Sequence, residues 1–276
     1  MNSSEFRTEA RSKLSGKWGK AAVIALAYCF ILWVIGFVSE KLPGILSTLG
    51  SIAEIVVGIP LAFGFVKAYV KLYNGEDVSA FDFFSLGFNG FKLSWGIFFR
   101  ILGKLIIPFI LMIVGYFIMI FGVVGAGVGF IASASVTSQS SYAPIANSMA
   151  TGFSAVGVIG IILFLASAIW YTIKSYYYQL SYIIAADDET VESKDAVDKS
   201  RELMEGKRWK LFVLQLSFIG WAILGVLTLG IGYLWLIPYM QFAIIAFYKW
   251  VSGNASNVKT EPITEIPSEE ITKTEE

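Results

Sequence analysis

Histidine is absent from the 276-residue chain, and cysteine occurs once, at Cys29. The absence of histidine excludes Ser-His-Asp triads, histidine metal sites and histidine pH switches. A single cysteine excludes an internal disulfide and a cysteine-rich zinc site. Charged residues are also scarce, at 15%, and the formal net charge is zero, so the chain lacks the basic surface that binds nucleic acid. We therefore expect no catalytic residues, no metal, no cofactor and no nucleic-acid partner.

Hydrophobic residues are correspondingly abundant, at 56% of the chain, compared with roughly 45 to 50% in soluble domains. A helix needs about 20 apolar residues to cross a membrane, and the stretch from Leu105 to Ile173 alone contains 69 residues without a charge. The sequence therefore predicts an all-α integral membrane protein, with a membrane domain over residues 21–250. Its six transmembrane helices are expected to form three hairpins, at about residues 21–39, 46–70, 105–131, 153–173 or longer, 211–229 and 233–248.

Lysine and arginine fall almost entirely on one side of this topology. Twenty of the 21 basic residues lie before the first span, near or within the connections after the second and fourth spans, or after the sixth span. Only Lys41 falls on the other side. Because cytoplasmic loops are enriched in Lys and Arg, we predict that both termini and the two long connections are cytoplasmic.

Two segments on the basic side have the pattern of amphipathic helices. Residues 1–20 carry a stripe made of Phe6, Ala10 and Leu14, and residues 193–205 carry a longer apolar face opposite their charged residues. We predict that both helices lie on the cytoplasmic membrane surface. Residues 251–276 lack an apolar pattern and are acidic, which predicts a disordered cytoplasmic tail.

These two segments also resemble each other. With a shift of 190 residues, six of 16 positions are identical, and they include the pairs Gly16 and Gly206, and Lys17 and Lys207. The match predicts an internal repeat in which an interfacial element precedes a helical hairpin. A looser third copy from Phe81 to Lys92 precedes the third span.

Two ionisable residues are candidates for an ion or substrate pathway. Glu54 lies about eight residues inside a span that begins near Leu46, and Gly58 and Pro60 are expected to break that helix. If the span instead begins at Ile55, Glu54 lies at the outer surface. Lys174 lies near the middle of the membrane if its helix continues to about residue 186, and Glu54 is then its nearest acidic partner. If the boundary falls near residue 173, Lys174 extends its amine to the interface.

Other candidates have simpler interpretations as well. Arg100 and Lys104 at the start of the third span are candidates for contact with lipid headgroups, or they only extend to the interface. The acidic run at residues 187–189 could bind a divalent cation, although a solvated loop is the commoner role. Gly125 and Gly129 lack the context of a phosphate loop, and their spacing is typical of close helix packing.

Several short motifs carry a resemblance to a known family. They are Ala10-Arg11, Leu14, Gly16, Trp18, Ser200-Arg201, Met204, Gly206, Leu216 to Trp221, Gly230-Ile231-Gly232, Pro238-Tyr239 and Phe247-Tyr248. Over about residues 5 to 250 the chain resembles a bacterial family of multi-pass membrane proteins known as domain of unknown function 975. The resemblance implies an integral protein of the bacterial cytoplasmic membrane, with no established activity and no catalytic residues.

Two functions remain open at this stage. The first is a non-enzymatic accessory protein that binds the lipid bilayer and another membrane protein or a further copy of this chain. The amphipathic helices, the acidic tail and the scarcity of charge within the spans favour it. The alternative is a small transporter or channel that uses Glu54.

Overall fold

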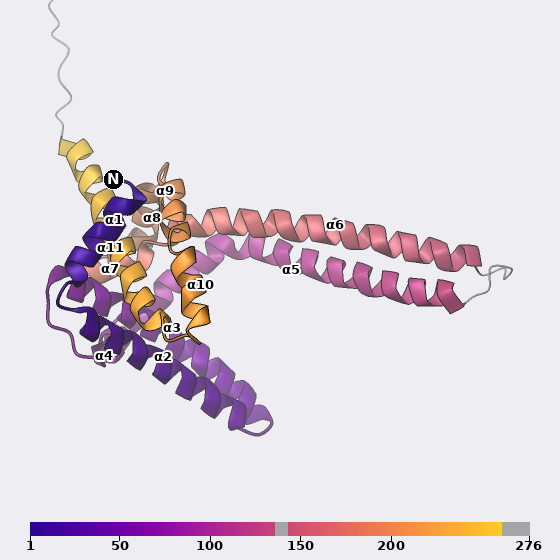
Figure 1. The fold of residues 1–276 in the computed structure, drawn as a ribbon, viewed down its shortest axis with the longest axis horizontal. Coiled ribbons are helices and arrows are strands. Elements are labelled where there is room, and N and C mark those ends of the chain that lie inside the picture. The colour runs from indigo at the N-terminus through magenta and orange to yellow at the C-terminus, as the bar shows by residue number, and fades with distance from the viewer. Residues whose placement is uncertain (136–142, 261–276) are drawn as a thin grey trace, which may run out of the picture.

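The computed structural model describes residues 1–135 and 143–260, and within these ranges every regular element is a helix (Figure 1). Six helical segments are long and apolar enough to span a membrane, which confirms the predicted all-α, six-span fold class. The elements in chain order are α1 (Ser3–Leu14), α2 (Trp18–Lys41), α3 (Ile45–Asn74), α4 (Asp82–Asn89), α5 (Phe91–Ser135), α6 (Ala143–Ser175), the short 3-10 helix η1 (Tyr176–Tyr178), α7 (Ser181–Asp187), α8 (Ser193–Met204), α9 (Arg208–Leu216), α10 (Ile219–Leu227) and α11 (Tyr233–Thr260).

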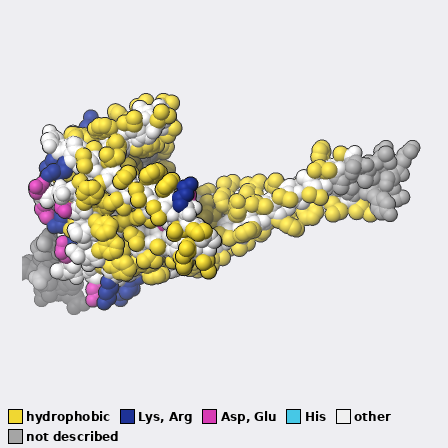
Figure 2. All heavy atoms as spheres, turned by 90° about the horizontal axis from the view of Figure 1, so that it is seen from below, with side chains coloured by type: hydrophobic (Ala, Val, Ile, Leu, Met, Phe, Trp, Pro, Cys, Tyr) yellow, Lys and Arg dark blue, Asp and Glu magenta, His cyan; other side chains and the backbone are white. Residues whose placement is uncertain are grey.

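The helices form a body from which two helix pairs project (Figure 1). The pair α5 and α6, called the arm below, is the longer projection, and the pair α2 and α3 points in a different direction. The buried core lies in the body and includes Phe6, Ile24, Tyr69, Phe83 and Phe242. Most charged side chains lie on the end of the body away from the arm, one basic cluster lies where the arm begins, and hydrophobic side chains cover most of the described part of the arm (Figure 2).

A seam of glycines holds the two helices of the arm together. A Cβ atom added at Gly122 would lie 2.1 Å from the backbone nitrogen of Gly157, and one added at Gly160 would lie 2.3 Å from that of Met119. Gly129 faces the backbone of Ala150 in the same way, and Gly125 faces the ring of Phe153. Because lipid provides no hydrophobic drive between helices, close backbone approach is a main source of their association. These glycines therefore act in packing.

We expect Gly122→Ala to reduce the free energy of unfolding of the arm by about 2 kcal/mol, because the new methyl group would overlap backbone atoms that cannot rotate away. Gly127→Ala on the same helix is the matched control, since no atom lies within 4 Å of its added Cβ. Unfolding in mixed detergent micelles, followed by circular dichroism, measures both variants. Equal stability of the two variants would contradict the close packing of α5 against α6 at Gly122.

The predicted internal repeat is visible in the backbone. Helices α1 and α8 each contain 12 residues, and each is followed by a glycine with positive φ, +75° at Gly16 and +71° at Gly206. The next helix begins two residues after each glycine. Glycine is favoured at this elbow because a residue with a Cβ atom is sterically strained at positive φ. The third copy differs, because α4 is shorter and Gly90 has φ −92°.

The apolar faces of α1 and α8 are covered by the protein itself. Phe6 is 1% exposed, and its ring packs edge-on against Phe247 and Trp250 of α11 at centroid distances of 5.4 and 5.5 Å. On α8, all five residues of the expected apolar face are buried: Ala196, Val197, Ser200, Leu203 and Met204. The predicted helices are therefore present and their apolar stripes pack against protein, whereas their position on the cytoplasmic membrane surface stays a prediction.

The boundaries of several elements differ from the predicted ones. Helix α3 continues through Gly58 and Pro60 without a break. The fifth span is divided at residues 217–218, where the Ser217 hydroxyl donates a 2.6 Å hydrogen bond to the Leu214 carbonyl oxygen. Helix α6 begins ten residues before the expected start at residue 153, and α11 continues to Thr260, into the predicted tail. The rest of that tail, residues 261–276, lies outside the described residues.

Candidate functional site

Glu54 lies within the α2 and α3 pair. It is nine residues beyond the start of α3, and its side chain is half-buried. One carboxylate oxygen lies 3.6 Å from the position that a Cβ atom would take at Gly36 of α2, so the carboxylate rests where α2 has no side chain. Among the described residues, no ion pair of Glu54 occurs within 4.0 Å. The carboxylate is thus on the inner face of this helix pair.

Lys174 lies near the end of α6, on the other helix pair. Its amine is 5.1 Å from the centroid of the Trp170 ring, one turn earlier on the same helix. The two pairs point in different directions (Figure 1), and no ion pair within the described part of the chain joins Lys174 to Glu54. The structure therefore does not bring these two candidates together.

Arg100 and Lys104 of α5 both contact α8. The Arg100 Nε donates a 3.1 Å hydrogen bond to the hydroxyl of Ser193, and the Lys104 amine lies 3.6 Å from the Asp198 carboxylate. Both basic residues are exposed. These contacts connect the base of the arm to the body, and a role in binding lipid headgroups stays a prediction.

The acidic run after α7 directs its three side chains to different partners. Asp187 accepts hydrogen bonds from the Lys249 amine at 2.6 Å and from the Tyr248 hydroxyl at 3.0 Å. Asp188 accepts from the Thr190 hydroxyl and amide, which lowers the pKa of its carboxyl. Glu189 pairs with Lys67 of α3 at 2.9 Å. In residues 1–135 and 143–260, no three potential ligands gather to hold a metal ion.

The Lys67–Glu189 pair connects α3 to the loop before α8. The Lys67 side chain is only 10% exposed, whereas Glu189 is 64% exposed. We expect Glu189→Gln to reduce the free energy of unfolding by about 1 to 2 kcal/mol, because it leaves a buried ammonium without its counter-ion. Lys67→Met removes both the charge and its desolvation cost, so its effect should be smaller. Detergent unfolding of both variants at neutral pH measures the difference, and a larger loss for Lys67→Met would contradict it.

This contact also depends on pH. A hydrogen bond and the positive charge of Lys67 lower the pKa of Glu189 in the folded protein. The stabilisation is therefore complete above the unfolded-state pKa of about 4.3, and it is lost as the pH falls through the lower folded-state value. Glu189→Gln should remove this part of the acid sensitivity.

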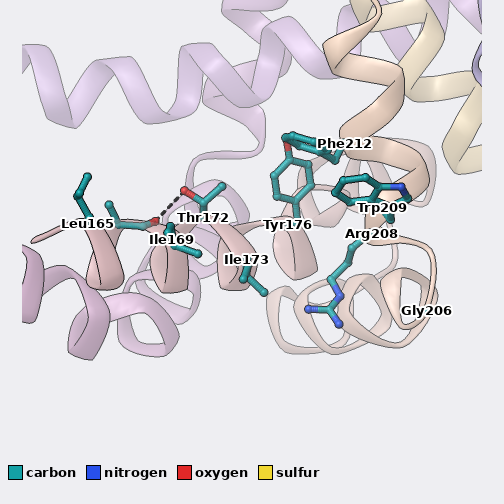
Figure 3. Close-up of a pocket in the computed structure, with 10 residues that line it drawn as sticks. Leu165, Ile169, Thr172, Ile173, Tyr176, Gly206, Arg208, Trp209 and Phe212 are labelled. Atoms are coloured by element: carbon teal, nitrogen blue, oxygen red, sulfur yellow. Dashed lines mark hydrogen bonds between the residues drawn. The ribbon is translucent and has the colours of Figure 1, made fainter. Parts of the chain in front are cut away.

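A cavity of about 640 Å³ lies between α6 and α9, where the arm joins the body (Figure 3). Leu165, Ile169 and Ile173 form its apolar wall on α6, and Phe212 and the 72% exposed Trp209 face them from α9. The rings of Trp209 and Phe212 lie 5.1 Å apart, centroid to centroid. We call this cavity the arm cleft. Its shape and lining suit an apolar ligand.

Both hydroxyl groups that line the arm cleft are hydrogen-bonded within the protein. The Thr172 hydroxyl donates to the Ala168 carbonyl oxygen at 2.8 Å, and the Tyr176 hydroxyl donates to Gln215 at 2.6 Å. The Arg208 guanidinium carbon lies 4.1 Å from the centroid of the Tyr177 ring. This set contains no nucleophile next to a general base, which acyl or group transfer would require. The described lining of the arm cleft is therefore mainly apolar.

Sequence reasoning did not find the arm cleft. Its two walls come from segments about 40 residues apart, and each wall alone is an ordinary apolar helix face. The only sequence signal was the basic and aromatic cluster at residues 207–210, which predicts an interfacial position. That signal locates one end of the cleft but not its opposite wall.

Comparison with known proteins gives a family but no activity. A family model described as a protein of unknown function (DUF975) matches residues 1–255. No curated protein and no solved structure matches the chain.

Proposed function

Because the chain belongs to the DUF975 family of proteins of unknown function, we propose its activity from its architecture: a non-enzymatic membrane protein that binds another membrane protein through the arm. The observation that carries the proposal is the exposed apolar surface of α5 and α6. Their outward side chains include Phe117 and Val124, which are 64% and 58% exposed. The outer part of the arm projects away from the other helices (Figure 1).

The close packing of the arm supports the same function. Its two helices touch backbone to backbone along the glycine seam, which favours a preorganised exposed surface. A preorganised surface loses less conformational entropy when a partner binds. The outer part of the arm also stands apart from the body, which leaves its outward surface free of the protein's other helices.

The protein is proposed to lie in a bacterial cytoplasmic membrane, with both termini in the cytoplasm. The distribution of 20 of 21 basic residues on one side supports this orientation. A reporter that is active only outside the cytoplasm should be active when fused after Ser141 and silent after Gly253. The reverse pattern would overturn the orientation.

A second candidate function, a small transporter or channel, rests on Glu54. Its half-buried carboxylate on the inner face of the α2 and α3 pair is the observation that favours it. Intramembrane carboxylates commonly mark ion or proton pathways. Ion flux into liposomes that contain the purified protein tests this candidate. A flux that Glu54→Gln abolishes would support it, and the absence of any flux would remove it.

The partner proposal is tested by crosslinking in native cells, followed by purification through a tag at the C-terminus and mass spectrometry. We expect one second membrane protein, or a further copy of this chain, in a fixed ratio. The double variant Phe117→Ala with Val124→Ala should reduce its recovery at least tenfold. The control pairs Phe30→Ala with Val38→Ala on α2, where the two side chains are 58% and 52% exposed. Equal losses in both variants, or no partner with the wild type, would contradict the proposal.

A further inference from the structure

A second cavity, of about 500 Å³, lies between α1 and the pair α10 and α11. We call it the α1 cleft. Arg7 and Arg11 line it from α1, whereas Trp221 and Leu224 of α10 and Trp235 of α11 supply apolar surface. No acidic residue is among its described lining residues. The cleft thus combines two positive charges with an apolar wall.

The two arginines lack the partners that such groups usually have. The Nε atom of Arg7 is buried and has no hydrogen-bond partner within the described part of the chain. Arg11 contacts the ring of Tyr239, with 5.9 Å between its guanidinium carbon and the ring centroid. Neither arginine forms an ion pair with an acid of the described residues. An unpartnered buried donor costs free energy unless a ligand satisfies it.

The positions of the charged residues on α1 also favour binding of an anion. Arg7 and Arg11 are four residues apart on one helix, so they share a face and repel each other. Glu9 of the same helix lies on the opposite side, where it accepts a 2.5 Å hydrogen bond from the Tyr73 hydroxyl of α3. An anion between the two guanidinium groups would relieve the repulsion.

The other wall of the α1 cleft shows what kind of anion fits. Trp221, Leu224 and Trp235 are each more than half exposed, and they belong to helices apolar enough to span a membrane. Exposed apolar surface on helices of this kind suits an acyl chain. We propose that the α1 cleft binds one anionic phospholipid, with its phosphate between Arg7 and Arg11 and an acyl chain along the tryptophan wall.

The internal repeat provides a contrast. Arg201 of α8 corresponds to Arg11, but the counterpart of Arg7 is Val197, which is buried. The second copy therefore lacks the arginine pair, and the lipid site belongs to the first copy alone. This site is independent of the partner surface proposed for the arm.

Native mass spectrometry of the purified full-length protein, with added phosphatidylglycerol or phosphatidylcholine, tests the proposal. The wild type should retain one phosphatidylglycerol and bind phosphatidylcholine far more weakly. Replacing both arginines, Arg7→Gln with Arg11→Gln, should weaken phosphatidylglycerol binding about 25-fold, since each basic residue near a lipid headgroup contributes roughly a factor of five. The control Lys13→Gln with Arg201→Gln removes the same net charge outside the cleft and should leave binding unchanged.

Thermal unfolding in detergent separates a binding defect from a folding defect. Phosphatidylglycerol should raise the melting temperature of the wild type and of the control, but not that of the arginine variant. Without lipid, all three proteins should melt at similar temperatures. Equal binding of both lipids by the wild type would overturn the proposal. So would equal losses in the two double variants, or displacement of the lipid by inorganic phosphate at millimolar concentration.

Discussion

Replacing Gly64 with alanine is expected to destabilise the body by about 3 kcal/mol. Gly64 of α3 touches the backbone of α4, and a Cβ atom at this position would lie 1.9 Å from the Phe83 carbonyl oxygen and 2.6 Å from the Gly87 nitrogen. The added methyl group would meet only backbone atoms of Phe83 and Gly87, so no side chain can rotate to make room. Unfolding of the purified protein in mixed micelles, followed by tryptophan fluorescence, measures the loss.

Gly58→Ala is the control for this experiment. Gly58 lies on the same helix, but an added Cβ meets no atom within 4 Å. Since alanine is about 1 kcal/mol more favourable than glycine within a helix, this variant should be as stable as the wild type or more stable. A Gly64→Ala protein as stable as the control would show that α3 and α4 do not touch at this point.

Phe6→Ala should reduce the free energy with which α1 packs against the body by about 3 to 5 kcal/mol, and so release the helix. Phe6 fills a buried site between Phe247 and Trp250 of α11, and its removal leaves a cavity there. Because α1 contains Arg7 and Arg11, limited trypsin digestion provides the measurement: the variant should be cleaved at these positions at least tenfold faster than the wild type.

Phe81→Ala is the matched control for α1 docking. Phe81 is 62% exposed, so its truncation should change trypsin sensitivity little. If the Phe6→Ala protein were cleaved no faster than this control, α1 would be held by the membrane surface and not by α11. That outcome would support the prediction, made from periodicity alone, that the apolar stripe of α1 lies on the membrane surface.

The helices could be predicted because their signals are local. Uncharged stretches of sufficient length identify the six spans, and the spacing of Phe6, Ala10 and Leu14 identifies both a helix and the side that it buries. The 190-residue repeat likewise predicts that α1 and α8 end in the same elbow, because a glycine occupies the same position in each copy.

What these faces contact could not be predicted. Periodicity shows that a stripe is apolar, but lipid and protein both cover apolar surface. The partners of Phe6 lie more than 240 residues away along the chain. The break at residues 217–218 falls inside an uncharged stretch, so hydropathy does not reveal it. Helix α3 likewise continues through Pro60, although proline usually ends or kinks a helix, and the Pro60 carbonyl oxygen lies close to α4.

The candidate sites show the same limit. Pairing of Glu54 with Lys174 required the two projecting helix pairs to meet, and they diverge instead (Figure 1). The four-residue spacing of Arg7 and Arg11 is visible in the sequence, but the absence of acids around them is a property of the folded chain. Both clefts arise between helices that are far apart in sequence, so no local motif encodes them.

Site-specific photocrosslinking tests most directly whether the arm binds a membrane protein. A photoreactive phenylalanine analogue replaces Phe117 on the arm or Phe30 on α2 in the full-length chain, and cells are illuminated before purification. We predict that the analogue at Phe117 gives one discrete crosslinked protein, whereas the analogue at Phe30 gives only lipid adducts. Lipid adducts alone at both positions would contradict the proposed function.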